Sequence, residues 1–98
     1  MLPVNCADQL KIIANSTRLA VLELLWESPK RVAEINQVIK VEQSLLSHHL
    51  KTLRKAGFLI SEQTGKGRLY RLSPAVEVID VNGLKSKGLN LGCCILCF

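Results

Sequence analysis

The chain has 98 residues, 48% of them hydrophobic, and a mean hydropathy of +0.22. This size and apolar content indicate one compact domain and exclude a disordered tail or a large enzyme with a deep pocket. Only 4% of the residues are aromatic, which argues against a platform that stacks single-stranded bases. No apolar run is long enough to span a bilayer, and the N-terminal stretch lacks the order of a signal peptide, so we expect a cytoplasmic protein without a membrane partner. A chain this short leaves apolar faces uncovered, which favours a homodimer.

The formal net charge of +5 is concentrated in one third of the chain. Residues 40–72 contain seven basic and two acidic residues, whereas the rest of the chain is balanced. This excess of positive charge predicts that residues 40–72 bind a polyanion. The alternative is a charged surface that contacts only solvent. The basic residues are Lys40, Lys51, Arg54, Lys55, Lys66, Arg68 and Arg71.

Apolar residues recur at helical spacing in four segments before residue 58, and we expect four helices. The first is short and lies around residues 10–14. The second begins at the capping residues Asn15 and Ser16 and stops at Ser28 and Pro29. The third covers residues 32–39, and the fourth covers residues 42–56, with Gly57 as its C-terminal cap. Because the last two helices are joined by a very short break, they predict a helix-turn-helix.

After Gly57 the pattern alternates, which is typical of strands. Residues 58–63 and 68–72 alternate on either side of turn residues 64–67, so they predict a β-hairpin with a basic tip. The fold class is therefore mainly α with a small β-hairpin, a winged helix-turn-helix that we expect to be dimeric. Residues 1–74 are expected to form this DNA-binding domain, and residues 75–98 an apolar, cysteine-containing tail.

The exposed face of the fourth helix has the order expected of a helix that enters the major groove. Short hydroxyls and an imidazole come first, and cations that meet phosphates follow, with no carboxylate after Glu42. Together with the basic hairpin, this order favours nucleic acid over an ordinary solvated face. Leu45, at the edge of the apolar stripe, either contacts a thymine methyl or packs on the third helix, and packing is favoured. The predicted DNA-binding residues are Gln43, Ser44, Ser47, His48, Lys51, Lys55, Lys66 and Arg68.

The adjacent histidines point about 100° apart on a helix. His48 lies on the solvent side, where it can contact a base or phosphate. His49 borders the apolar stripe, and we expect a half-buried ring that donates to a backbone carbonyl. Helical neighbours cannot turn toward one metal, and no carboxylate is placed to orient a catalytic base. The pair therefore predicts neither a metal site nor an enzyme.

Three stretches resemble the ArsR/SmtB family of winged-helix repressors. They are residues 14–19 (ANSTRL), residues 43–57 (QSLLSHHLKTLRKAG), and the wing with residues 65–67 and 70–72. The resemblance covers residues 8–74. It implies a homodimeric, cytoplasmic, prokaryotic repressor that leaves its operator when an inducer binds. It also implies that Gln43, Ser44, Ser47, His48 and Lys51 face the operator.

The two inducer sites common in that family do not transfer to this chain. One needs cysteines in the third helix, and residues 32–36 contain none. The other needs histidines and carboxylates after the wing, where this chain has Glu77 and Asp80 but no histidine. The first helix and the tail are then left to form the dimer contact.

Cysteines near both chain ends are the remaining candidates for an inducer site. Cys93, Cys94 and Cys97 lie within the last six residues, with Cys6 near the other end. Three soft donors suit a thiophilic ion such as arsenite, or part of a zinc site. In one extended strand Cys94 would point away from Cys93 and Cys97, so the tail must bend, or Cys6 or a partner chain must contribute. The alternatives are a thiol switch and apolar packing of the cysteines in a terminal strand.

The sequence therefore predicts a repressor that binds an inverted repeat in double-stranded operator DNA. Its inducer is expected to be an arsenite-like metalloid or metal bound at Cys93, Cys94 and Cys97, with Cys6 as a further candidate, and no cofactor is obligatory. A redox- or polysulfide-sensing repressor with the same cysteines is the alternative. A winged-helix protein-interaction module without an inducer and a small thiol metal carrier also stay open.

Overall fold

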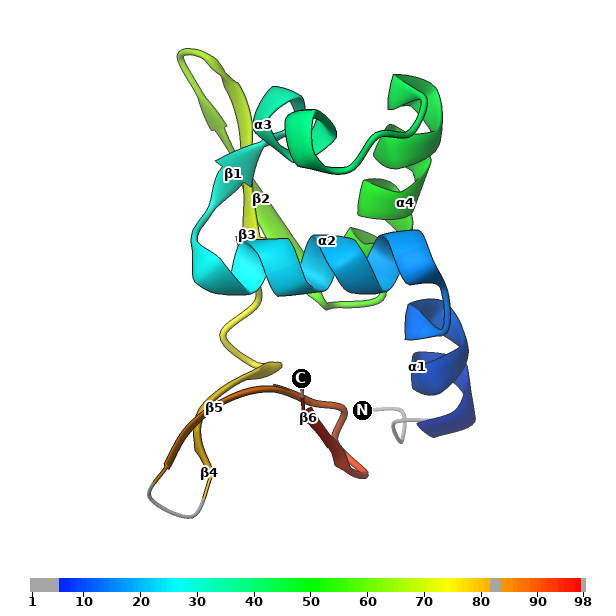
Figure 1. The fold of residues 1–98 in the computed structure, drawn as a ribbon, viewed down its shortest axis with the longest axis vertical. Helices are drawn as coiled ribbons and strands as arrows, with labels where there is room; N and C mark the ends of the chain where they lie inside the picture. Colours follow the sequence, from blue (N-terminus) through cyan, green and yellow to red (C-terminus); the bar gives the residue numbers. More distant parts are fainter. Residues whose placement is uncertain (1–5, 82–83, 98) are drawn as a thin grey trace.

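The computed structural model describes residues 6–81 and 84–97. Helices α3 and α4 and the β2–β3 hairpin lie at one end, α2 crosses the middle, and β4–β6 lie at the other end (Figure 1). The mainly α winged helix-turn-helix fold is confirmed. The elements are α1 (Cys6–Ile13), α2 (Ser16–Glu27), β1 (Lys30–Arg31), α3 (Val32–Val38), α4 (Gln43–Lys55), β2 (Leu59–Thr64), β3 (Gly67–Leu72), β4 (Glu77–Val81), β5 (Leu84–Asn90) and β6 (Ile95–Cys97).

Local capping sets the ends of the two helices that frame the core. The Asn15 side chain accepts hydrogen bonds from the backbone N–H groups of Thr17 and Arg18 at 3.0 and 3.1 Å, which caps α2. At the end of α4, Gly57 has φ +90°. The Gly57 N–H bonds the Arg54 carbonyl and the next N–H bonds the Leu53 carbonyl, which is a Schellman motif. This motif turns the chain directly from α4 into the hairpin.

One apolar core joins the helices to both sheets. Its fully buried side chains come from α2, α3, α4, the hairpin and β5, and α1 contributes at its last residue. Burial of each large apolar side chain contributes about 1.5–3 kcal/mol of transfer free energy. The core side chains are Ile13, Val21, Leu22, Leu25, Ile35, Leu46, Leu50, Leu53, Phe58, Leu59, Leu72, Leu89 and Leu91.

The hairpin belongs to a three-stranded antiparallel sheet in the order β1-β3-β2. Within it, Lys30 pairs with Tyr70 and Arg31 with Leu69. A two-residue strand is too short to show an alternating pattern, so β1 was not predicted from the sequence. It fixes the chain just before α3 against the wing.

The tail forms a second antiparallel sheet in the order β4-β5-β6, and this sheet covers the core from below α2. Trp26 on α2 donates its indole N–H to the Gly88 carbonyl at 3.2 Å, and Leu89 and Leu91 are buried. Part of the tail therefore packs on the core within one chain. No helix in the described part of the chain is long and apolar enough to cross a membrane.

Candidate nucleic-acid interface and thiol cluster

Helix α4 is strongly amphipathic, with Leu46, Leu50 and Leu53 fully buried in the core. Its opposite face and the wing carry every residue predicted to contact DNA, and each one is exposed. The exposed cations of the wing come from the turn and from β3, at the same end of the molecule as α3 and α4. The exposed set is Gln43, Ser44, Ser47, His48, Lys51, Lys55, Lys66 and Arg68.

Some of these side chains have partners within the chain. Ser44 Oγ donates to Glu42 Oε1 at 2.6 Å, and Arg68 Nη1 donates to Ser61 Oγ at 3.1 Å. The second contact holds the guanidinium along the wing. Leu45 is 46% exposed, so its packing on the third helix stays a prediction. Its apolar side chain is available to a thymine methyl group.

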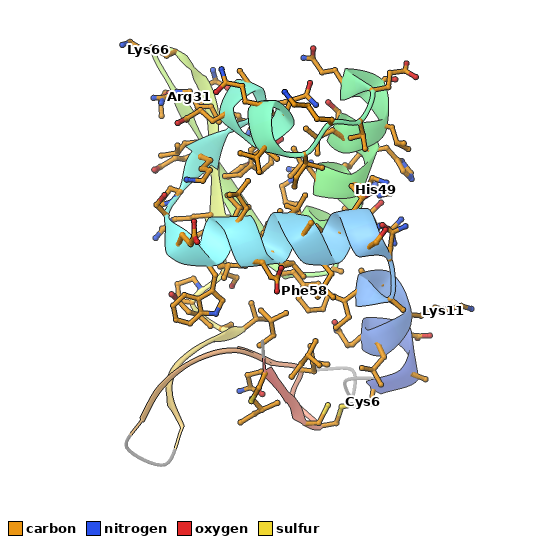
Figure 2. All side chains as sticks on the ribbon, viewed as in Figure 1. Cys6, Lys11, Arg31, His49, Phe58 and Lys66 are labelled. Carbon is orange, nitrogen blue, oxygen red and sulfur yellow. A yellow bond between two sulfur atoms is a disulfide. The ribbon has the colours of Figure 1, made fainter. Side chains whose placement is uncertain are left out.

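Arg31 is a wing residue that the sequence analysis missed. It lies on β1, close to the hairpin that carries Lys66 (Figure 2). Its Nη2 donates to Thr64 Oγ1 at 3.5 Å, and its Nη1 lies 3.9 Å from Glu34 Oε1. Among the described residues, Arg31 Nε is a buried side-chain donor without a hydrogen-bond partner. Because its strand is only two residues long, no alternating pattern in the sequence could place Arg31 beside the wing.

His49 lies behind the exposed face of α4 and is 7% exposed. Its Nδ1 accepts a hydrogen bond from Arg18 Nε at 2.9 Å, so the expectation of a ring that donates to a backbone carbonyl is wrong. Arg18 Nη1 also donates to the Ile12 carbonyl at 3.1 Å. Burial, followed by the charges of Arg18 and His48, lowers the pKa of His49 below its usual value of 6.5. The unprotonated ring that accepts from Arg18 is therefore favoured.

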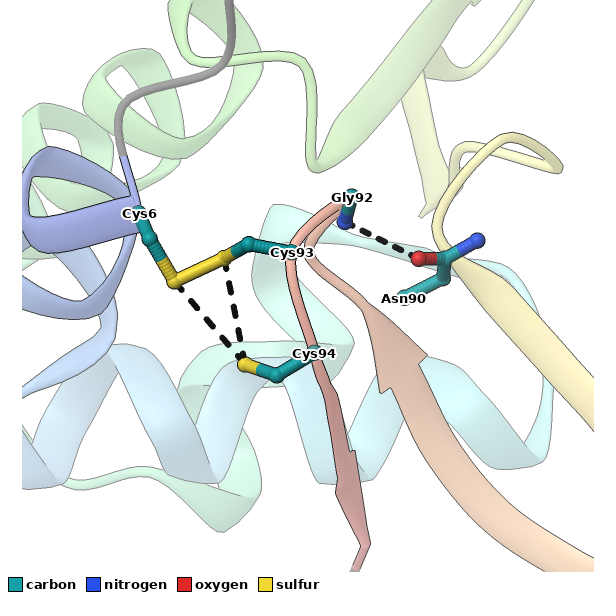
Figure 3. The surroundings of a disulfide bond; sticks show 5 residues. All are labelled: Cys6, Asn90, Gly92, Cys93 and Cys94. Carbon is teal, nitrogen blue, oxygen red and sulfur yellow. Dashed lines mark hydrogen bonds between the residues drawn. A yellow bond between two sulfur atoms is a disulfide. The ribbon is translucent and has the colours of Figure 1, made fainter.

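The two ends of the chain meet in a cluster of three sulfurs, which we call the thiol cluster: Cys6, Cys93 and Cys94 (Figure 3). Cys6, the first residue of α1, forms a disulfide with Cys93. Cys94 Sγ lies 4.0 Å from each of the two bonded sulfurs. Cys93 and Cys94 are exposed, and Cys6 is partly exposed.

A tight turn brings these cysteines together. Between β5 and β6 the Leu91 N–H bonds the Cys94 carbonyl at 2.9 Å, and Asn90 Oδ1 accepts from the Gly92 N–H at 2.9 Å. Gly92 has φ +88°, a conformation that L side chains rarely adopt. The tail bends at the cysteines, as three-sulfur chelation requires.

Cys97 is not part of the thiol cluster, and Cys6 takes the place predicted for it. The intervening strand β6 is extended, at about 3.3 Å per residue, so it carries Cys97 roughly 10 Å along the chain from Cys94. Cys97 is a free, exposed thiol.

The cluster can support two kinds of chemistry. Once the Cys6–Cys93 bond is reduced, three thiolate ligands lie close enough to hold one thiophilic ion, since their sulfurs are all within 4.8 Å of one another. Alternatively, the same sulfurs can form and exchange disulfides.

Comparison with known proteins gives consistent matches to one family of regulators. The family model described as "Bacterial regulatory protein, arsR family" matches residues 15–61. The chain is 31% identical to the HTH-type transcriptional regulator NmtR of Mycobacterium tuberculosis, over 88% of this chain and 73% of that protein. It is 34% identical to the arsenical resistance operon repressor of Bacillus subtilis, over 90% of this chain and 78% of that protein.

Other matches cover a smaller share of the protein to which this chain is compared. The alignment with the SmtB repressor of M. tuberculosis, at 39% identity, covers 67% of this chain and 49% of that protein. Among solved structures, the chain is similar to a homodimeric winged helix-turn-helix domain from Mycobacterium bovis, named as a possible ArsR-family regulator. The TM-score is 0.61 at 27% identity, over 64% of this chain and 58% of that chain.

Proposed function

Because this chain belongs to the ArsR family of bacterial regulatory proteins, and is thus a DNA-binding transcriptional regulator rather than an enzyme, we propose that it is a repressor released from its operator by a thiol-directed inducer. The observation that carries the inducer proposal is the thiol cluster, in which three sulfurs from both chain ends lie within 4.8 Å of one another.

The proposed DNA contacts follow from exposure and chemistry. The hydroxyl and imidazole groups of Ser47 and His48 would contact base edges, while Lys51, Lys55 and the wing cations would neutralise phosphates. Arg31 joins this set as a residue that supports the wing. Because the regulator reaches chromosomal DNA, its proposed compartment is the cytoplasm.

A homodimer on an inverted repeat is the proposed assembly, in keeping with the homodimeric M. bovis domain. Two recognition helices would then enter successive major grooves about 34 Å apart. Leu10 on α1 and Ile95 on β6 are 42% and 50% exposed and offer apolar contacts to a second copy. Sedimentation at micromolar concentration tests the dimer, and a monomer with intact DNA affinity would contradict it.

The proposed inducer is an arsenite-like metalloid held by the thiolates of Cys6, Cys93 and Cys94. Thiolates bind soft ions far better than hard ions such as Mg²⁺. The metalloid requires the reduced cluster, since a sulfur in the Cys6–Cys93 bond has no thiolate to offer. The reduced protein is therefore the form that binds DNA and awaits the inducer.

A mobility-shift titration on the DNA upstream of the protein's own gene tests this function. The reduced protein should bind, arsenite should release it, and Mg²⁺ should not. Replacing Cys93, Cys94 and Cys97 together by serine should leave operator affinity nearly intact and abolish release, whereas Cys97→Ser alone should respond as the wild type does. Normal release of the triple variant would place the sensor elsewhere.

A redox or polysulfide switch is the second candidate, favoured by the bonded pair Cys6–Cys93 with Cys94 at 4.0 Å. In this case an oxidant supplies the electron acceptor, the two thiols lose two protons and two electrons, and the disulfide form leaves DNA. Release by an oxidant alone, reversed by dithiothreitol, distinguishes it from metalloid release under reductant.

A further inference from the structure

A partly buried contact links α1, which begins at the thiol cluster, to α4, the proposed recognition helix. Arg18 on α2 donates through Nε to His49 of α4 at 2.9 Å and through Nη1 to the carbonyl of Ile12 in α1 at 3.1 Å. One guanidinium thus spans three helices. Figure 2 shows His49 where α4 approaches α2, with Cys6 at the far end of α1.

Helix α1 is held at both of its ends. Its first residue is Cys6, bonded to Cys93, and Ile12 in its last turn accepts from Arg18. Between these points the helix is poorly packed. Ile13 is its buried residue, Leu10 is 42% exposed, and a cavity of about 250 Å³ lined by Gln9, Ala56 and residues 75–76 and 90–92 lies beside it. Opening the Cys6–Cys93 bond therefore removes the covalent restraint on the position of α1.

We propose that Arg18 and His49 are positioning residues that couple the state of the thiol cluster to the recognition helix. When the disulfide opens, α1 shifts and the Ile12 carbonyl leaves Arg18. The guanidinium then loosens its contact with His49 Nδ1. His49 lies between the exposed His48 and the buried Leu50. A change in the contact of its ring therefore alters the position of the exposed face of α4 relative to the core. The consequence for DNA rests on the thiol-controlled release proposed above.

The chemistry of the contact makes it sensitive to small displacements. A guanidinium has five donors and no acceptor, so His49 Nδ1 must be unprotonated to accept from it. Lysine at position 18 keeps the positive charge but presents a point charge that cannot occupy both acceptors with the same planar geometry. Asparagine at position 49 keeps an acceptor near the place of Nδ1 without titrating.

The test follows His49 itself, by NMR titration of the imidazole signals in the full chain with the Cys6–Cys93 bond formed and with it reduced. Opening the bond should raise the pKa of His49, because the nearby cation and its hydrogen bond both favour the neutral ring. The exposed His48 is the internal control and should shift less. Identical His49 titration midpoints in the two thiol states would overturn the coupling.

Variants locate the path and connect it to DNA. In Arg18→Lys the His49 midpoint should no longer respond to the thiol state, and an unchanged response would exclude Arg18 as the link. If this variant fails to fold, the wild-type titration still decides the proposal. For DNA binding, His49→Asn should keep more of the wild-type affinity ratio between reduced and disulfide forms than His49→Leu, and equal ratios in the two variants would rule out a role for the acceptor.

The two proposals fail separately. If His49 responds to the disulfide but DNA affinity is the same in both thiol states and with arsenite, the coupling stands and thiol-controlled release is wrong. If DNA affinity depends on the thiol state while His49 does not respond, release stands and its path does not pass through Arg18.

Discussion

The end proposed to bind DNA and the thiol end of this molecule are built in opposite ways. The residues of α4 that we propose to face DNA follow one another within 13 residues and need only a helix to share a face. The thiol cluster joins Cys6 to Cys93, 87 positions apart, and needs the whole chain to be folded. The surface of one helix is thus determined by the local sequence, whereas the cluster made by both chain ends forms only when the tertiary structure forms.

The two ends should also differ in what substitutions change. The side chains proposed to contact DNA are exposed, so removing them should affect binding with little effect on stability. The disulfide constrains the unfolded chain, so removing it should affect stability. The following experiments test this contrast, beginning with the largest expected change in free energy.

Cys6→Ser should lower the free energy of unfolding in non-reducing buffer by roughly 2–5 kcal/mol, because the lost bond closes a loop of most of the chain. Urea denaturation followed by circular dichroism measures the change. Cys97→Ser removes a free, exposed thiol and is the matched control, with no change expected beyond about 0.5 kcal/mol. Equal midpoints for the two variants would show that the two ends of the chain are not tied in solution.

Replacing Lys51, Lys55 and Arg68 together by alanine should weaken binding to every DNA duplex by at least about 100-fold, because three phosphate contacts are lost from each protomer of the proposed dimer. The slope of log affinity against log salt should fall by about five, since six contacts are lost per dimer. Fluorescence anisotropy over a range of salt concentrations gives both quantities.

Lys11→Ala removes an exposed cation from α1, outside α4 and the wing. Because it removes one positive charge, it is the control for the effect of losing a single cation. It should leave both the affinity and the salt slope unchanged. Unchanged DNA affinity in the triple variant would refute docking through α4 and the wing.

Ser47→Ala and His48→Ala should each reduce the preference for operator over random DNA, on the order of tenfold, since base-edge contacts are lost while phosphate contacts remain. Competition binding with operator and scrambled duplexes measures the preference. A uniform loss on both duplexes would assign these residues to the backbone instead.

Much of the fold was predictable because it depends on residues that are close together in the sequence. Leu46, Leu50 and Leu53 recur at helical spacing, Asn15 can cap only the helix that follows it, and Gly57 suits the left-handed end of α4. These preferences act within one or two turns and do not depend on the rest of the chain. The same local pattern correctly predicted that the eight proposed DNA-contact residues are exposed.

The tertiary structure decided the contacts between distant segments. The sequence by itself determined that the chain contains soft sulfur ligands, but only folding brought Cys6 to Cys93 and Cys94 and left Cys97 apart. Likewise, His49 found its partner 31 residues away in Arg18 rather than in a nearby carbonyl. The physical reason is that helical and strand periodicity set which way a side chain faces along its own element, while the partner it meets depends on how the elements close around one core.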